Sequence, residues 1–289
     1  MDIDFNTIVL CGGSGKGIAL LGALQYLIDQ KIINNIDTYI GTSVGTIIGF
    51  LLIIGYTPIE IIIYMCTNNI LEKVYSFNIV EMINGNGALS FANFQETLEK
   101  MTIEKIGILP TLSDLYKKFN KTLILTTYNL TKHKVEYLSY KEYPDLPCLT
   151  AIRMSSNLPL IFEPYTYNNS QYIDGGVVDN FPIDVVDKMN KKILGLNIPH
   201  KLKEGDMHKN IIEYIYTLLS IPSSKYLDEK IKTLSDNCFV ATIDCDSLSN
   251  FNFNIDSITK LDIFSSGYNQ IRDYLKNTNG EDSEENESI

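Results

Sequence analysis

The chain has 289 residues, a size that fits one large domain or two small ones. Hydrophobic residues make up 45% of it and charged residues 20%, which is ordinary globular composition and excludes a mostly disordered or fibrous chain. The formal net charge is −11, so nucleic acid is not an expected partner and electrostatic adhesion to anionic membranes is disfavoured.

Short apolar runs alternate along the chain with segments of helical spacing. The predicted strands are 7–10, 38–40, 121–129, 134–139, 171–173, 192–198 and 238–243. The predicted helices are 18–28, 44–54, one opening at Pro58, 90–100, 149–155, 183–189, 208–220 and 258–275. This alternation predicts a three-layer α/β/α fold, in which a central, mostly parallel sheet lies between helices.

Three segments differ in composition and position. Residues 5–200 are expected to form the main domain. Residues 201–276 are expected to add helices and a strand that pack on the same domain. Residues 277–289 carry five acids and no base, and such a polar, like-charged segment is expected to be a disordered tail.

No targeting or membrane-spanning segment is expected. Residues 1–7 lack the positive charge that begins a signal peptide. Residues 38–59 are uncharged, but their dense apolar part, 44–54, would be about 16 Å long as a helix, half of a bilayer core. A buried central helix fits this segment better. We therefore expect a cytoplasmic protein whose contact with membranes is at most transient and peripheral.

The cysteines and histidines indicate neither a disulfide framework nor a metal site. The five cysteines form no CxxC pair, and most lie in apolar runs, as core cysteines in a reducing compartment do. Only three histidines are present, and none has the spacing of metal ligands. We expect no metal and no organic cofactor.

A glycine-rich loop, GGSGKG at 12–17, follows the first strand and opens a helix. Its backbone N–H groups can converge on one point beside a positive helix N-terminus and hold a phosphate or a developing oxyanion. A P-loop would need glycine at position 10 and Ser or Thr at 17, where Leu10 and Gly17 stand. The dinucleotide fingerprint also fails, because its third glycine would fall at Ile18. An anion-facing role is favoured over a merely tight turn.

A GxSxG motif, Gly41 to Gly45, lies between a predicted strand and a predicted helix. This is the context of a nucleophile elbow, in which a strained serine projects beyond the end of a strand. The pattern favours Ser43 as a nucleophile over a structural turn.

A nucleophilic serine needs a proton acceptor, and the sequence offers three candidates. Asp174 ends a short apolar segment and precedes two glycines, which let the backbone turn sharply and bring the carboxylate to another loop. A buried carboxylate has a raised pKa and can act as a general base. His200 would complete a triad with Ser43 and Asp174. Asp179 is a further carboxylate, for which we prefer a role in a surface loop.

Three linked motifs in this order resemble the patatin-like phospholipase family, over residues 5–200. They are the run LCGGSGKG at 10–17, GTSVG at 41–45 and DGG at 174–176, the last with SSNLP at 155–159, FEP at 162–164 and NFP at 180–182 around it.

The resemblance implies a Ser–Asp dyad without histidine, with Ser43 as nucleophile and Asp174 as base. It places the oxyanion hole at Gly12, Gly13, Ser14 and Gly15. Residues that support the loop and the elbow would be Lys16, Gly17, Gly41, Gly45, Gly175 and Gly176. The implied activity is hydrolysis of carboxylic esters in phospholipids, lysophospholipids or related acyl lipids.

One position departs from the family pattern. The third glycine of the oxyanion loop is Ser14 here, which keeps the N–H donor but resists a positive φ. Either Ser14 takes that φ under strain, or Gly15 takes up the turn.

Two other functions, and the role of two apolar segments, remain open at this point. A phosphate-binding or nucleotide-binding protein would use only the 12–17 loop, and an inactive scaffold would keep the fold with an impaired loop. Residues 59–65 and 77–83 are apolar enough to line an acyl pocket or touch a bilayer, but core packing explains them as well.

Overall fold

The computed structural model describes residues 5–68, 84, 86–189, 191–199, 211–245 and 255–279. Its strands are β1 (Thr7–Leu10), β2 (Thr38–Thr42), β3 (Thr122–Asn129), β4 (Lys134–Leu138), β5 (Tyr165–Tyr167), β6 (Ser170–Asp174), β7 (Ile193–Asn197) and β8 (Cys238–Thr242). Its longer helices are α1 (Gly17–Asp29), α2 (Val44–Ile53), α3 (Pro58–Thr67), α5 (Ala92–Ile106), α6 (Leu112–Phe119), α7 (Cys148–Ser155), α8 (Ile183–Asp187), α9 (Ile211–Ile231) and α10 (Ser257–Asn279). Two short 3₁₀ turns are η1 (Ser14–Lys16) and η3 (Gly175–Val177).

The strands form one mixed sheet in the order β5-β6-β3-β2-β1-β7-β8, with β4 also paired to β3. The five strands β3, β2, β1, β7 and β8 run parallel, whereas β4 and β6 are antiparallel to β3. β1 and β2 are entirely buried, as expected for parallel strands covered on both faces. Leu10 pairs with Gly41, so the segments that follow β1 and β2 emerge side by side.

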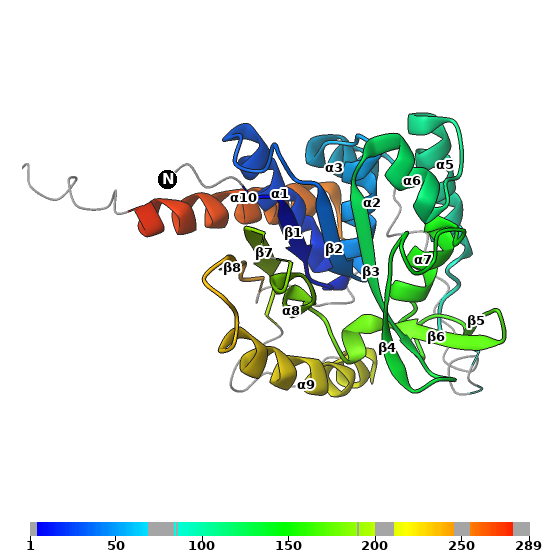
Figure 1. Ribbon diagram of the computed structural model, residues 1–289. Helices are drawn as coiled ribbons and strands as arrows, with labels where there is room; N and C mark the ends of the chain where they lie inside the picture. The colour runs from blue at the N-terminus through cyan, green and yellow to red at the C-terminus, as the bar shows by residue number, and fades with distance from the viewer. Residues whose placement is uncertain are drawn as a thin grey trace, which may run out of the picture.

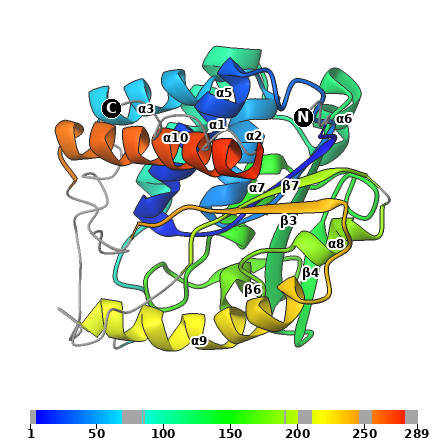
Figure 2. The same cartoon turned by 90° about the vertical axis from the view of Figure 1, so that its left-hand side faces the viewer.

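Helices cover both faces of the sheet (Figures 1 and 2). In Figure 2, α1, α2, α3 and α10 lie above the strands, and α8 and α9 lie below them. α2 contacts β1, β2 and β3, and α10 packs along α1. The expected three-layer architecture is therefore confirmed, with a mixed sheet at its centre.

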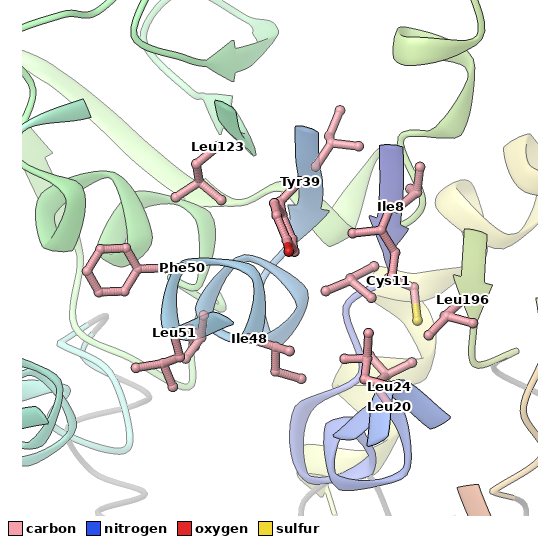
Figure 3. Close-up of a cluster of buried hydrophobic side chains, with 14 of the residues drawn as sticks. Ile8, Cys11, Leu20, Leu24, Tyr39, Ile48, Phe50, Leu51, Leu123 and Leu196 are labelled. Carbon is pink, nitrogen blue, oxygen red and sulfur yellow. The ribbon is translucent and has the colours of Figure 1, made fainter. Parts of the chain in front are cut away.

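The core between the sheet and the upper helices is apolar (Figure 3). Ile8 and Tyr39 from β1 and β2 point toward Leu24 of α1 and Ile48 of α2, and all four are buried. Burying an aliphatic side chain of this size contributes about 1.5–3 kcal/mol. Such packing fixes α1 and α2 against the strands, and with them the loops that join strand to helix.

The largest differences between the structure and the predicted elements are at α6, β5, α9 and α10. α6 and β5 were not predicted, although a capping box between Thr111 and Asp114 starts α6. α9 continues through Pro222 to Ile231 instead of ending at residue 220, and the buried Ser220 and Ser223 hold the helix on the domain on both sides of the proline. α10 extends to Asn279, so residues 277–279 are helical rather than part of a disordered tail, and the remainder of that tail lies outside the described residues.

Within the described part of the chain, no single helix is long and apolar enough to cross a bilayer. α2 and α3 meet that test only together, with a bend of 116° between them. In the same residues, no group of three or more His, Cys, Asp or Glu side chains is placed to hold a metal ion. None of the five cysteines, all of which lie in the described residues, forms a disulfide.

Candidate active site

Ser43 stands at a sharp turn between β2 and α2. Its backbone has φ 53° and ψ −124°, a strained combination for a residue with a side chain. Gly45 permits the turn, because a Cβ there would overlap the carbonyl oxygen of Leu10 in β1. The structure thus forms the elbow that the GxSxG motif predicts, and it leaves Ser43 8% exposed.

Ser155, the last residue of α7, supports this turn from below. Its hydroxyl accepts a hydrogen bond from the Ser43 N–H (3.1 Å) and donates one to the carbonyl of Thr126 in β3 (2.7 Å). Ser155 is fully buried. Sequence analysis placed it only in the SSNLP motif, and no local pattern reveals that it contacts a residue 112 positions away.

Asp174 ends β6 and is 1% exposed. Its Oδ1 accepts from the Gly176 N–H at 2.7 Å. Oδ2 makes no hydrogen bond of normal geometry to a described residue. Burial raises the pKa of Asp174 to about 6, while the nearby Ser43 side chain and the Gly176 N–H act in the opposite direction. The carboxylate is therefore a stronger base than an exposed aspartate and lies beside Ser43.

The loop after β1 brings its amides to the same place. Ser14 has φ 50°, so Ser14 itself takes the left-handed conformation and Gly15 does not. The Gly12 N–H donates to the Asn180 carbonyl (3.2 Å), and the Asn180 side chain donates to the Gly12 carbonyl (3.1 Å). Gly12 is engaged in this way, and Gly15 does not line the cavity that contains Asp174, whereas Gly13 and Ser14 do. Gly13 and Ser14 are therefore better candidates for oxyanion donors than the full predicted set from 12 to 15.

The remaining predicted loop and elbow residues lie around these groups. Lys16 is 5% exposed and lies on the lining of the cavity that holds Asp174. Gly17 packs against Val44 of α2, and Gly175 against the Thr126 carbonyl. Gly41 contacts the backbone of Gly45. The structure therefore brings the three sequence motifs together at one edge of the sheet.

Two cavities meet at Ser43: one of mixed lining that contains the Asp174 carboxylate, called the polar cavity below, and one that is apolar. The polar cavity, of about 40 Å³, is lined by the glycine-rich loop, Asp174, Asn180 and the inner face of α9. The apolar cavity, of about 130 Å³, is lined almost entirely by hydrocarbon side chains. They include Ile18, Leu21, Val44, Ile47, Ile48, Leu51, Ile61, Met65, Phe91, Phe94, Leu98, Met101, Leu158 and Phe162. Ile61 and Met65, from the apolar segment 59–65, lie on this lining, and Ile61 is also part of the core. The second apolar segment, 77–83, lies outside the described residues.

Asp179 is placed differently from expectation. It is 2% exposed rather than on a surface loop, because Lys230 of α9 reaches it at 2.6 Å and the Tyr137 hydroxyl donates to its other oxygen at 2.7 Å. Both oxygens are thus occupied. His133 is exposed in the β3–β4 turn, and His200 and His208 lie outside the described residues.

Comparison with known proteins agrees with this geometry. Residues 8–187 match the family model described as Patatin-like phospholipase. The chain belongs to this family. The match includes the glycine-rich loop, the serine elbow and Asp174, which are the segments that meet at the candidate site.

Relatives of this patatin-like chain include viral and fungal proteins. A "Probable lipid hydrolase 463L" of Invertebrate iridescent virus 6 is 42% identical over 195 residues, which are 65% of this chain and 65% of the viral protein. "Lysophospholipase NTE1" of Meyerozyma guilliermondii is 28% identical over 189 residues, 65% of this chain but 12% of that protein. The chain thus spans less than two thirds of each of these two relatives.

Solved structures share the patatin-like fold at low sequence identity. VipD from Legionella pneumophila superposes with a TM-score of 0.57 at 17% identity, covering 95% of this chain and 67% of VipD. ExoU from Pseudomonas aeruginosa, in its complex with SpcU, gives 0.54 at 16% identity, covering 94% of this chain and 51% of the other.

Proposed function

We propose that the chain is a serine hydrolase that cleaves carboxylic esters of phospholipids, lysophospholipids or related acyl lipids. The observation that carries the proposal is the position of Ser43 on the lining of both cavities. An acyl chain fits the chemistry of the apolar cavity, and the polar cavity holds the buried carboxylate that would activate the serine. Family membership and the lipid hydrolase names of the relatives support the same activity.

In the first half-reaction, Ser43 Oγ would attack the ester carbonyl carbon while Asp174 takes its proton. The carbonyl electron pair moves onto oxygen, and the Gly13 and Ser14 N–H groups would stabilise that charge. Collapse of the tetrahedral intermediate breaks the ester bond. The departing alcohol oxygen takes the proton from Asp174, and the acyl group stays on Ser43.

In the second half-reaction, Asp174 would take a proton from a water molecule as that water attacks the acyl carbon. The second tetrahedral intermediate then expels Ser43 Oγ, which recovers the proton from Asp174. The products are an alcohol, such as a lysophospholipid or a glycerophosphodiester, and a fatty acid. None of the steps proposed here requires a metal or an organic cofactor.

A lipid-panel assay tests the proposal. The purified protein should release fatty acid from at least one class among phospholipids, lysophospholipids and glycerides, and a fluorophosphonate probe should label Ser43. A protein that hydrolyses no acyl lipid and takes no label would contradict it. Thermal stabilisation by ATP without hydrolysis would favour the nucleotide-binding alternative, and absence of both would favour the inactive scaffold.

The pKa of Asp174 predicts the pH dependence of turnover. Because the base must be ionised, kcat/KM for a soluble ester should fall about tenfold for each pH unit well below the apparent pKa. That pKa is about 6, so the acidic limb should lie there rather than near the ordinary aspartate value of 3.8. Initial rates over an acid-to-neutral series locate the limb, and a limb near the ordinary value would remove Asp174 from the role of base.

The positive φ of Ser14 predicts opposite effects for two substitutions. A residue with a side chain carries about 1–3 kcal/mol of strain in such a conformation, and glycine carries little. Part of that strain would fall on the N–H donors of the loop. Ser14→Gly should therefore raise kcat, by at most about tenfold, with little change in KM, because the oxyanion forms only near the transition state.

Ser14→Val should lower kcat by about 10²–10³, the usual effect of losing one oxyanion donor. A β-branched residue tolerates positive φ worst and would displace the loop. Steady-state kinetics on one soluble ester compares the three proteins. A valine variant as active as the wild type would show that residue 14 plays no part in stabilising the oxyanion.

A further inference from the structure

Arg153 is a buried cation that the reaction described above does not use. It is one of two arginines in the sequence and lies in the last turn of α7, where its side chain is 3% exposed. Taking a charge out of water costs several kcal/mol unless other groups compensate it. The groups around this guanidinium therefore indicate what the arginine is there to hold.

One set of contacts reaches the wall of the apolar cavity. The guanidinium carbon lies 4.2 Å from the ring centre of Phe91 and 5.6 Å from that of Phe162, close enough for cation–π attraction. Phe91 in turn contacts Phe94 and Phe162 edge to face, at 5.2 and 5.1 Å between ring centres. All three phenylalanines line the apolar cavity. Arg153 thus supports an aromatic wall from the side away from the cavity.

Glu163 completes this support. Arg153 Nη2 donates to the Glu163 carbonyl (3.0 Å) and lies 3.2 Å from its carboxylate. The same carboxylate accepts from the backbone N–H of Phe91 (3.2 Å). The backbone just before α5 is thereby fixed to the segment that carries Phe162, and the two sides of the wall cannot move apart without breaking these bonds.

A further contact leads toward the base. Arg153 Nη1 donates to the side-chain oxygen of Asn157 (2.7 Å), and the Asn157 carbonyl accepts from the Asp174 N–H (2.9 Å). Asn157 is 2% exposed and also donates to the Tyr172 carbonyl (2.8 Å). The bonds of Asn157 to Asp174 and Tyr172, both in β6, do not involve Arg153. They therefore remain when Arg153 Nη1 is lost. The aromatic wall has no equivalent second cation among the described residues.

We propose that Arg153 is a positioning residue that sets which acyl chains the apolar cavity accepts, by holding the Phe91–Phe94–Phe162 wall. The inference rests on the proposed function, since it assigns the acyl group to that cavity. Arginine suits the task because its planar fork binds two acceptors while its face lies on a ring. Lysine keeps the charge but has neither the fork nor the flat face.

The test compares Arg153→Lys with the wild type on butanoyl, octanoyl and dodecanoyl esters of p-nitrophenol. KM for the dodecanoyl ester should rise about tenfold, which is a typical effect of a changed fit in an apolar pocket. The butanoyl ester should be turned over almost as before, since it reaches little of the wall. Arg272→Lys is the matched control, because that arginine lies at the surface beside Asp273 and should leave all three esters unchanged.

A uniform fall in kcat at every chain length would overturn the proposal and assign Arg153 to the Asp174 segment instead. An unchanged profile would overturn it as well. If Arg153→Lys fails to fold, Phe91→Leu removes the ring that the guanidinium covers and should shift the chain-length profile in the same way.

Binding in a Ser43→Ala background separates this proposal from the proposed function. The affinity for a fluorescent long-chain fatty acid should fall about tenfold on adding Arg153→Lys, whether or not the protein hydrolyses esters. A wild type without any esterase activity would refute the function. A wild type with full activity and an indifferent Arg153→Lys variant would refute only the role of Arg153.

Discussion

Ser43→Ala should lower kcat by about 10⁴–10⁶ while the protein stays folded. Without Oγ no acyl-enzyme can form, and only the oxyanion donors and substrate binding remain to assist water. The Ser43 N–H still donates to Ser155 in the variant, so the elbow should persist. Hydrolysis of a soluble ester, together with fluorophosphonate labelling, measures the effect.

Ser170→Ala serves as the control for that result. Ser170 is also a buried serine, 6% exposed, but it begins β6 at the opposite end from Asp174. The control should keep both turnover and labelling. A pure, folded Ser43→Ala protein with ordinary turnover would end the assignment of Ser43 as nucleophile.

Asp174→Asn is the second change from which we expect a large loss, on the order of 10⁴ in kcat. The amide can still accept from the Gly176 N–H but cannot take the proton of Ser43. The free energy of unfolding should not fall together with the activity. Since the pKa of Asp174 is raised in the folded state, its contribution to the free energy of unfolding decreases as the pH rises through about 6. The variant should therefore be at least as stable as the wild type at alkaline pH.

His200, the histidine that could form a triad, and His208, which lies eight positions further along the chain, supply the contrast. His200→Ala and His208→Ala should each keep most of the turnover, because no motif places either residue beside Ser43. Parallel kinetics and thermal unfolding of the three variants decide the point. If His200→Ala loses as much activity as Asp174→Asn and still folds, a Ser–His–Asp triad replaces the dyad.

Local patterns were sufficient for the parts of the site that depend on backbone turns. The GxSxG motif between a strand and a helix predicts the elbow at Ser43, and two glycines after Asp174 predict a sharp turn there. These predictions succeed because strained turns demand glycine at fixed offsets. The parallel strands β1 and β2 then carry the glycine-rich loop and the elbow to the same edge of the sheet.

Contacts between distant segments were not accessible in this way. The position of Asp179 in the sequence predicts a surface loop. In the structure it pairs with Lys230 of α9, which lies 51 positions further along the chain. Two hydrogen bonds join Gly12 to Asn180, which lies 168 positions further along the chain. They occupy the Gly12 N–H, so this amide is not available to an oxyanion. Whether Ser14 or Gly15 takes the positive φ also depends on packing around the loop, which spacing does not encode.

The junction of the two cavities at Ser43 has a kinetic consequence under the proposed function. The alcohol that leaves and the water that clears the acyl-enzyme would approach Ser43 through the same polar cavity, whose volume is about 40 Å³. A space of that size leaves little room for a water molecule beside the departing alcohol. Alcohol and water would therefore compete for one position, and the fate of the acyl group would depend on which arrives first. An added small alcohol should then divert part of the product from fatty acid to a new ester, in a ratio set by its concentration.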